Sequence, residues 1–127
     1  MFQLNDNYRK EAKEKWGGTA AYAEFSEKTK TRSAADSQKI NEGLDAVMGE
    51  FAAHMARGLR PDDAATQSLV GRLQGYISEH YYTCTNEILF GLGQMYAADE
   101  RFRENIDRHG DGAALYIREA IEAFCGA

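Results

Sequence analysis

The sequence predicts an all-α fold organised as a single domain. Apolar residues recur at helical spacing along almost the whole chain, and no segment has the pattern of a strand. Pro61 is the only proline, which favours helices over a loop-rich or sandwich fold. The chain has 127 residues, enough for one domain with a buried core.

Two long helices are predicted in the first part of the core. The first begins after Ser33, a good N-cap residue with Asp36 three positions on, and it ends at Gly58. A short turn follows, and the acids Asp62 and Asp63 favour the start of the second helix. The side chains expected to face the core are Ile40, Leu44, Val47, Met48, Phe51 and Met55 in the first helix, and Leu69, Leu73, Tyr76, Ile77, His80 and Tyr81 in the second.

Three shorter helices complete the predicted core. One begins near Thr85, the next is capped by Asp99, and the last follows a turn marked by Gly110 and Gly112. The side chains expected inside are Ile88, Leu92, Met95 and Tyr96 in the first, Phe102 and Ile106 in the second, and Ala113, Ile117, Ala120, Ile121 and Phe124 in the third.

The N-terminal segment differs from the core because its apolar content is thin. Two short helices fit it, with a break at Gly17 and Gly18 and with Thr19 as a cap. Its apolar anchors are Tyr8, Ala12, Trp16, Tyr22 and Phe25. Short helices with few anchors are marginal on their own. We therefore expect residues 1–32 to fold weakly over a core of residues 33–127, or only with a partner present.

The composition argues against several classes of function. Lys and Arg total 15 against 20 Asp and Glu, so the net charge is -5 and direct nucleic-acid binding by this segment is not expected. No apolar run reaches about 18 residues, so no membrane span is expected. No signal peptide is visible, and the distant Cys84 and Cys125 make no disulfide framework. These features predict a reduced, cytoplasmic protein.

No set of residues suggests catalysis, a metal site or a cofactor. The carboxylates are scattered, and no HxxxH or CxxC pair is present, so an enzyme is not expected. His80 lies on the apolar face of its helix, and a core histidine bonded to a backbone carbonyl or a tyrosine hydroxyl is the favoured interpretation. A donor lining a pocket and an axial haem ligand are its alternatives. Cys84 precedes a helix N-terminus that could lower its pKa, although a small buried residue is favoured.

The stretch from His80 to Asp107 suggests binding instead. Gly91 and Gly93 lie inside a predicted helix, where each glycine costs about 1 kcal/mol relative to alanine. Such a helix usually needs another helix or a ligand to come close to its backbone. The surrounding aromatic residues suggest an apolar cleft with polar edges, as in pockets for drug-sized molecules.

Several runs of residues follow one another in a recognisable order. They are WGGTAAY at 16–22, SEKT at 26–29, HYYTC at 80–84 and LGQMYAADERF at 92–102. In this order they resemble the TipAS antibiotic-recognition domain, the C-terminal effector domain of MerR-type transcription activators. The similarity extends over roughly residues 6 to 125.

The resemblance implies a globin-like helical fold without haem. It also implies a cleft for thiopeptides and other bulky antibiotics, over which the N-terminal segment becomes ordered. Family members that capture thiopeptides covalently have a cysteine directly before the Leu-Gly of the last run, where this sequence has Gly91. Gln94 likewise replaces the commoner glutamate. Non-covalent binding is therefore expected, and the expected ligand contacts are Trp16, Tyr22, His80, Tyr81, Gly91, Met95 and Tyr96.

The sequence thus leads to one main functional hypothesis and two alternatives. The main one is a non-enzymatic domain that senses or sequesters bulky peptide-like antibiotics. Its expected partners are the antibiotic and a DNA-binding domain or a full-length regulator. The alternatives are a globin-like haem sensor with His80 as axial ligand, and a helical protein-interaction domain whose cleft takes a partner helix.

Overall fold

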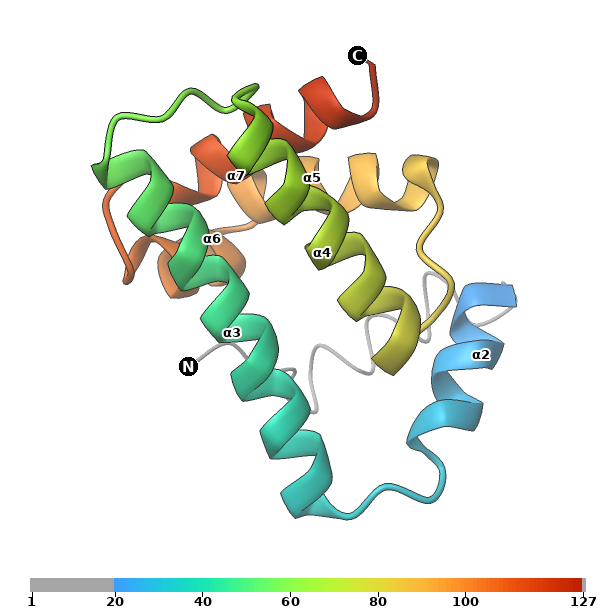
Figure 1. Ribbon diagram of the computed structural model, residues 1–127. Helices are drawn as coiled ribbons and strands as arrows, with labels where there is room; N and C mark the ends of the chain where they lie inside the picture. The colour runs from blue at the N-terminus through green and yellow to red at the C-terminus, as the bar shows by residue number, and fades with distance from the viewer. Residues whose placement is uncertain (1–19, 127) are drawn as a thin grey trace.

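The computed structural model describes residues 20–126, and their side chains from residue 23 onward. Over this range the protein contains six α-helices and no β-strand, which confirms the predicted all-α class (Figure 1). The helices are α2 (Ala20–Thr29), α3 (Ala34–Ala56), α4 (Ala64–His80), α5 (Asn86–Ala98), α6 (Glu100–Asp107) and α7 (Ala113–Phe124). Within the described range, no helix is long and apolar enough to cross a membrane.

Four of the described helices begin at residues that the sequence predicts as helix starts. Side-chain oxygens at four N-cap positions accept hydrogen bonds of 2.9–3.2 Å from backbone N–H groups in the first turn. Each cap of this kind contributes about 0.5–2 kcal/mol. The capping residues are Ser33, Asp63, Thr85 and Asp99. Gly58 follows α3 with a φ of 78°, a left-handed conformation that glycine adopts without strain.

The helix α7 is central to the fold, because it packs against α3, α4, α5 and α6. Its inward face includes Ala113, Ala114 and Ala120, which are fully buried and small enough to let neighbouring helices approach closely. Most predicted core residues are buried as expected. They are Leu44, Val47, Met48, Phe51, Leu69, Leu73, Ile77, Phe102, Ile106, Ala113, Ile117, Ala120 and Ile121. Ile40, Met55, Tyr76 and Phe124 lie half-buried at the edge of this core.

The inner face of α5 is shifted from the predicted one. The buried residues of this helix are Leu89, Gly93 and Tyr96, whereas Ile88, Leu92 and Met95 are only partly buried. Of the residues expected inside, only Tyr96 is fully buried, and the other three pack against the edge of the core. The reason is the contact with α7, where a Cβ added at Gly93 would lie 3.1 Å from Cδ1 of Ile121. Gly93 therefore faces α7, and this contact rotates α5 relative to the expected orientation.

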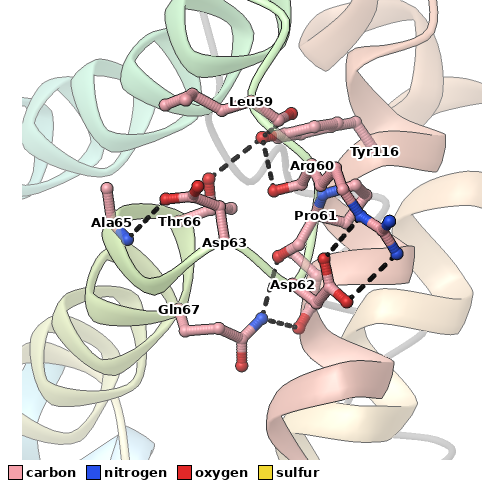
Figure 2. A network of polar contacts seen from close by, with 10 residues as sticks. Leu59, Arg60, Pro61, Asp62, Asp63, Ala65, Thr66, Gln67 and Tyr116 are labelled. Carbon is pink, nitrogen blue, oxygen red and sulfur yellow. Dashed lines mark hydrogen bonds and ion pairs between the residues drawn. The ribbon is translucent and has the colours of Figure 1, made fainter.

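A buried polar network joins the turn between α3 and α4 to α7 (Figure 2). Tyr116 donates its hydroxyl proton to the carbonyl of Leu59 at 2.9 Å, because a carbonyl can only accept. The hydroxyl of Thr66, 3.0 Å away and fully buried, must then donate to Tyr116. Nδ1 of His54 lies 3.0 Å from the same Thr66 oxygen, so this nitrogen must carry a proton. A single chain of hydrogen bonds therefore runs from α3 to α7 through α4.

Gln67 adds a second bridge between the same elements. Its side-chain amide donates to the carbonyl of Pro61 at 2.9 Å and to the carbonyl of Ala120 at 3.0 Å (Figure 2). One side chain thereby fixes the turn before α4 to the middle of α7. The turn between α3 and α4 is therefore held by Tyr116 from α7 and by Gln67 from α4.

Tyr116→Phe should lower the free energy of unfolding by about 1–3 kcal/mol, because the buried Thr66 hydroxyl loses its acceptor. Urea titration measures the change. The double variant Tyr116→Phe with Thr66→Val is the control. Its loss of unfolding free energy should be smaller than the sum of the losses in the two single variants, since both polar partners are then gone. Unchanged stability of Tyr116→Phe would contradict this account of the network.

The two glycines of α5 should respond differently to the same substitution. Gly93→Leu should destabilise the protein by about 1–3 kcal/mol, because the new side chain is forced against Ile121. Gly91→Leu should keep or raise stability, since a Cβ there meets nothing within 4 Å in the described structure and leucine is a better helix former. Thermal unfolding of both variants checks the difference, and equal melting temperatures would refute it.

Candidate ligand-binding site

The predicted contact residues fall on two parts of the described structure. His80 and Tyr81 lie at the end of α4, and Gly91, Met95 and Tyr96 lie on α5. Tyr22 belongs to α2, for which only the backbone is described at this position. Trp16, the Gly17–Gly18 break and the Thr19 cap lie outside the described residues.

His80 is the last residue of α4 and is not a core histidine. Its side chain is 27 % exposed, and Nε2 lies 3.7 Å from a carboxylate oxygen of Glu79. The imidazole is tilted against the ring of Tyr76, with 4.5 Å between the centroids. The interpretation as a buried residue bonded to a carbonyl or a tyrosine hydroxyl is therefore wrong. The helix ends at this position, so the ring lies at the edge of the packed interior.

Tyr81 follows directly and connects three helices. It is buried, with its ring stacked on Phe25 of α2 at a centroid distance of 6.2 Å and an interplanar angle of 12°. Its hydroxyl donates to Oδ1 of Asn41 on α3 at 2.7 Å. Burial raises the pKa of Tyr81 far above its usual value. The residue is thus a neutral hydrogen-bond donor that links α2 and α3 to the end of α4.

The helix α5 presents an interrupted apolar face. Gly91 is exposed, and a Cβ built on it meets no described atom within 4 Å, so this glycine does not contact another described helix. Met95 lies one turn further on and is half-buried. Tyr96 is only 2 % exposed and packs against Phe102 at 5.9 Å, so its ring belongs to the core. Ile88, Gly91 and Met95 therefore form an accessible strip along α5. Its central residue, Gly91, has no side chain.

The helix α2 and the link that follows it contact the end of α4 through charged side chains. Lys28 donates to the carbonyls of Ser78 and Glu79 at 2.6 and 3.2 Å, and Arg32 donates to the carbonyl of His80. These carbonyls belong to the last turn of α4, where helical partners are missing. These contacts could not be predicted from the sequence, since nothing in the pattern of residues 28–32 identifies their acceptors.

An anionic side chain of α2, Glu24, bonds the loop just after α4. Glu24 accepts from the backbone N–H of Thr83 at 2.7 Å and from its hydroxyl at 2.9 Å. The hydrogen bond from the Thr83 backbone is the main reason that the pKa of Glu24 lies below its usual value. The loop after α4 is thereby joined to α2 by a hydrogen-bonded carboxylate.

Cys84 is a buried thiol. It is 4 % exposed, and burial raises its pKa to about 12, so it is almost entirely protonated at neutral pH. Its backbone N–H donates to Oγ of Ser78 at 3.0 Å, which fixes the loop against α4. The possible activation by the N-terminus of α5 is therefore wrong, and the interpretation as a small buried residue is confirmed. Among the described residues, no group of three or more His, Cys, Asp or Glu side chains could hold a metal ion.

Comparison with known proteins identifies the family. The model of the TipAS antibiotic-recognition domain matches residues 8–124. The chain belongs to the TipAS family. Its membership confirms the resemblance based on the sequence runs at 16–29 and 80–102.

Two curated relatives are transcription regulators. The TipAS-family chain is 37 % identical over 118 residues to the HTH-type transcriptional activator mta of Bacillus subtilis, covering 93 % of the chain and 45 % of the relative. It is 39 % identical over 119 residues to the HTH-type transcriptional activator TipA of Streptomyces coelicolor, covering 93 % of the chain and 47 % of the relative. The chain thus spans about half the length of the curated relatives that it matches.

A solved structure agrees with the fold over nearly the whole chain. It is TipAS of Streptomyces lividans in complex with nosiheptide, described as part of a thiopeptide antibiotic multidrug resistance system. The TM-score is 0.86 at 35 % identity, and the match covers 98 % of this chain and 87 % of the other. The helical fold described above is therefore that of a TipAS domain.

Proposed function

We propose that this TipAS-family domain is the non-enzymatic effector domain of a MerR-type transcription activator and binds bulky peptide-like antibiotics. The observation that supports this most directly is the match, at 35 % identity and a TM-score of 0.86, to a TipAS domain in complex with nosiheptide. Family membership favours this function over a haem sensor or a protein-interaction domain. The proposed partner is a DNA-binding domain or a full-length regulator, because the two relatives are HTH-type transcriptional activators. The proposed location is the cytoplasm.

The proposed binding surface includes the accessible strip of α5. Ile88, Gly91 and Met95 are spaced by three and four residues, so they lie along one side of the helix. Ile88 and Met95 are partly exposed, and Gly91 between them leaves the backbone open. An apolar surface with room at its centre suits a large apolar ligand. The proposed contacts are Trp16, Tyr22, His80, Tyr81, Gly91 and Met95. Tyr96, which the sequence also suggested, packs inside the core and supports this surface from below.

We propose that capture of the antibiotic is non-covalent. Covalent capture through a cysteine needs a nucleophilic thiolate close to the ligand. Gly91 has no side chain, and burial raises the pKa of Cys84 to about 12. Burial also raises the pKa of Cys125, at the end of α7. Thiolate chemistry is therefore unfavourable at both cysteines.

The proposed mechanism of sensing is a population shift. Residues 1–32 would form a lid over a core of residues 33–127, and the ligand would bind the closed form of the lid more tightly than the open form. A ligand can change such an equilibrium only by the difference in its affinity for the two forms. Aromatic side chains on the lid would provide this difference, because they cover apolar surface with few torsions to restrict.

Nosiheptide should bind the full chain, and Gly91→Leu should weaken its binding by at least about tenfold, or 1.4 kcal/mol, because the new side chain fills the open strip. Gly75→Leu is the matched control. Gly75 is an exposed glycine on α4, and a Cβ there also meets nothing within 4 Å in the described structure. Isothermal titration calorimetry compares the three proteins. Normal binding by Gly91→Leu would place the ligand elsewhere.

The complex should release its ligand intact when the protein is denatured, since no thiolate is available to form a thioether. Intact mass spectrometry after incubation with nosiheptide and denaturation should give the mass of the unmodified chain. Cys84→Ser serves as the control. A stable adduct in the natural sequence that disappears in Cys84→Ser would disprove non-covalent capture.

A further inference from the structure

Two tyrosines at the end of α4 bond the N-terminal half of α3 through their hydroxyl groups. Tyr76 donates to the backbone carbonyl of Ile40 at 2.5 Å, and Tyr81 donates to Oδ1 of Asn41 at 2.7 Å. The two acceptors are consecutive residues of α3, so this part of the helix is fixed relative to the end of α4. The amide of Asn41 is therefore held beside Tyr81, which belongs to the proposed binding surface.

The proton of Tyr81 determines which way the Asn41 amide points. The oxygen and nitrogen of an asparagine amide are distinguished by their hydrogen-bond partners. Burial raises the pKa of Tyr81, so its hydroxyl keeps its proton at neutral pH and needs an acceptor. Among the described residues, Oδ1 of Asn41 is the acceptor that this hydroxyl meets. A reversed amide would leave the buried proton without an acceptor, which costs free energy. The amide oxygen therefore faces Tyr81.

The NH2 group of the same amide has no hydrogen-bond acceptor within the described structure. Over these residues, Nε of Arg118 is the only buried side-chain nitrogen or oxygen that lacks a hydrogen bond. Asn41 is half-buried, so its Nδ2, which also lacks a partner there, must be reachable from outside the protein. A pair of N–H donors in a fixed position is thus accessible beside Tyr81.

We infer that Asn41 is a specificity-determining residue of the proposed antibiotic site, and that its NH2 group donates to a carbonyl oxygen of the bound ligand. This inference rests on the proposed function, in which the ligand is a bulky peptide-like antibiotic. The amide bonds of such a ligand carry carbonyl oxygens, which are strong acceptors. Because Tyr81 already holds the Asn41 amide in place, little side-chain freedom is lost when the ligand binds.

A donor at this position selects among apolar ligands of similar size. A ligand that places a carbonyl against Asn41 replaces solvent as the hydrogen-bond partner of the NH2 group. A ligand without an acceptor there excludes solvent and leaves the two N–H groups without partners. Discrimination of this kind is larger than apolar contacts alone provide. The accessible strip of α5 would thus accept apolar bulk, and Asn41 would require a carbonyl.

Titration of Asn41→Asp with nosiheptide tests the inference. Aspartate has the shape of asparagine and keeps an oxygen for the Tyr81 hydroxyl, but its second oxygen repels a ligand carbonyl instead of donating to it. We expect the apparent affinity to fall by at least about tenfold in isothermal titration calorimetry. Gln38→Glu is the matched control, because it makes the same amide-to-carboxylate change at an exposed residue of the same helix. It should leave the affinity close to that of the natural chain.

Nuclear magnetic resonance of the isotope-labelled natural chain gives a second measurement that needs no variant. The side-chain N–H resonances of Asn41 should shift when nosiheptide is added, because these groups gain a carbonyl partner. The side-chain N–H resonances of Gln38 should stay in place. If thermal unfolding shows that Asn41→Asp does not fold, these resonances alone decide the inference.

The outcomes separate this inference from the proposed function. If the natural chain binds nosiheptide but the Asn41 resonances do not shift, or a folded Asn41→Asp binds normally, donation from Asn41 is overturned while the proposed function stands. Equal losses of affinity in Asn41→Asp and Gln38→Glu also overturn it, because the added charge then explains the effect. Absence of nosiheptide binding by the natural chain counts against the proposed function, and the role of Asn41 in recognition is overturned with it.

Discussion

The close contact between α5 and α7 determines where the rest of the structure can lie. Gly93 has no Cβ, so Ile121 packs directly against the backbone of α5. Since α7 also contacts α3, α4 and α6, its position relative to α5 affects three further interfaces of the core. The same contact turns Leu89 and Tyr96 inward and leaves Gly91 exposed. The accessible strip of α5 is thus a consequence of core packing.

Most of the fold could be predicted because its signals are local. Ser33, Thr85 and Asp99 mark helix starts, since a cap acts on a backbone N–H two or three residues away. The inner face of α5 could not be predicted in the same way. Apolar residues occupy most of its circumference, so periodicity does not select one face, and the residue that decides the orientation is the glycine at position 93.

The candidate site was predicted less completely, because its geometry depends on contacts between distant segments. The sequence identified Gly91 as a position for close approach, and the structure leaves it open. His80 was misjudged because spacing from Ile77 suggests a buried position even where the helix is about to end. The bonds from Lys28 and Arg32 to the end of α4 had no local signal. A lysine side chain can reach many carbonyls, and only the folded chain selects among them.

The physical nature of these bonds suits the opening and closing proposed for the lid. A lid held by a large apolar interface would stay closed, since each fully buried large side chain contributes about 1.5–3 kcal/mol. Partly exposed charges contribute roughly 1 kcal/mol for each contact to the closed form of a lid. The conformational entropy lost when the lid residues become ordered opposes this contribution. Such an equilibrium lies near balance, where a ligand with a few kcal/mol of preference for the closed form shifts most of the population. Capping of α4 by Lys28 and Arg32 can therefore give α2 a defined docking position while keeping that position sensitive to a ligand.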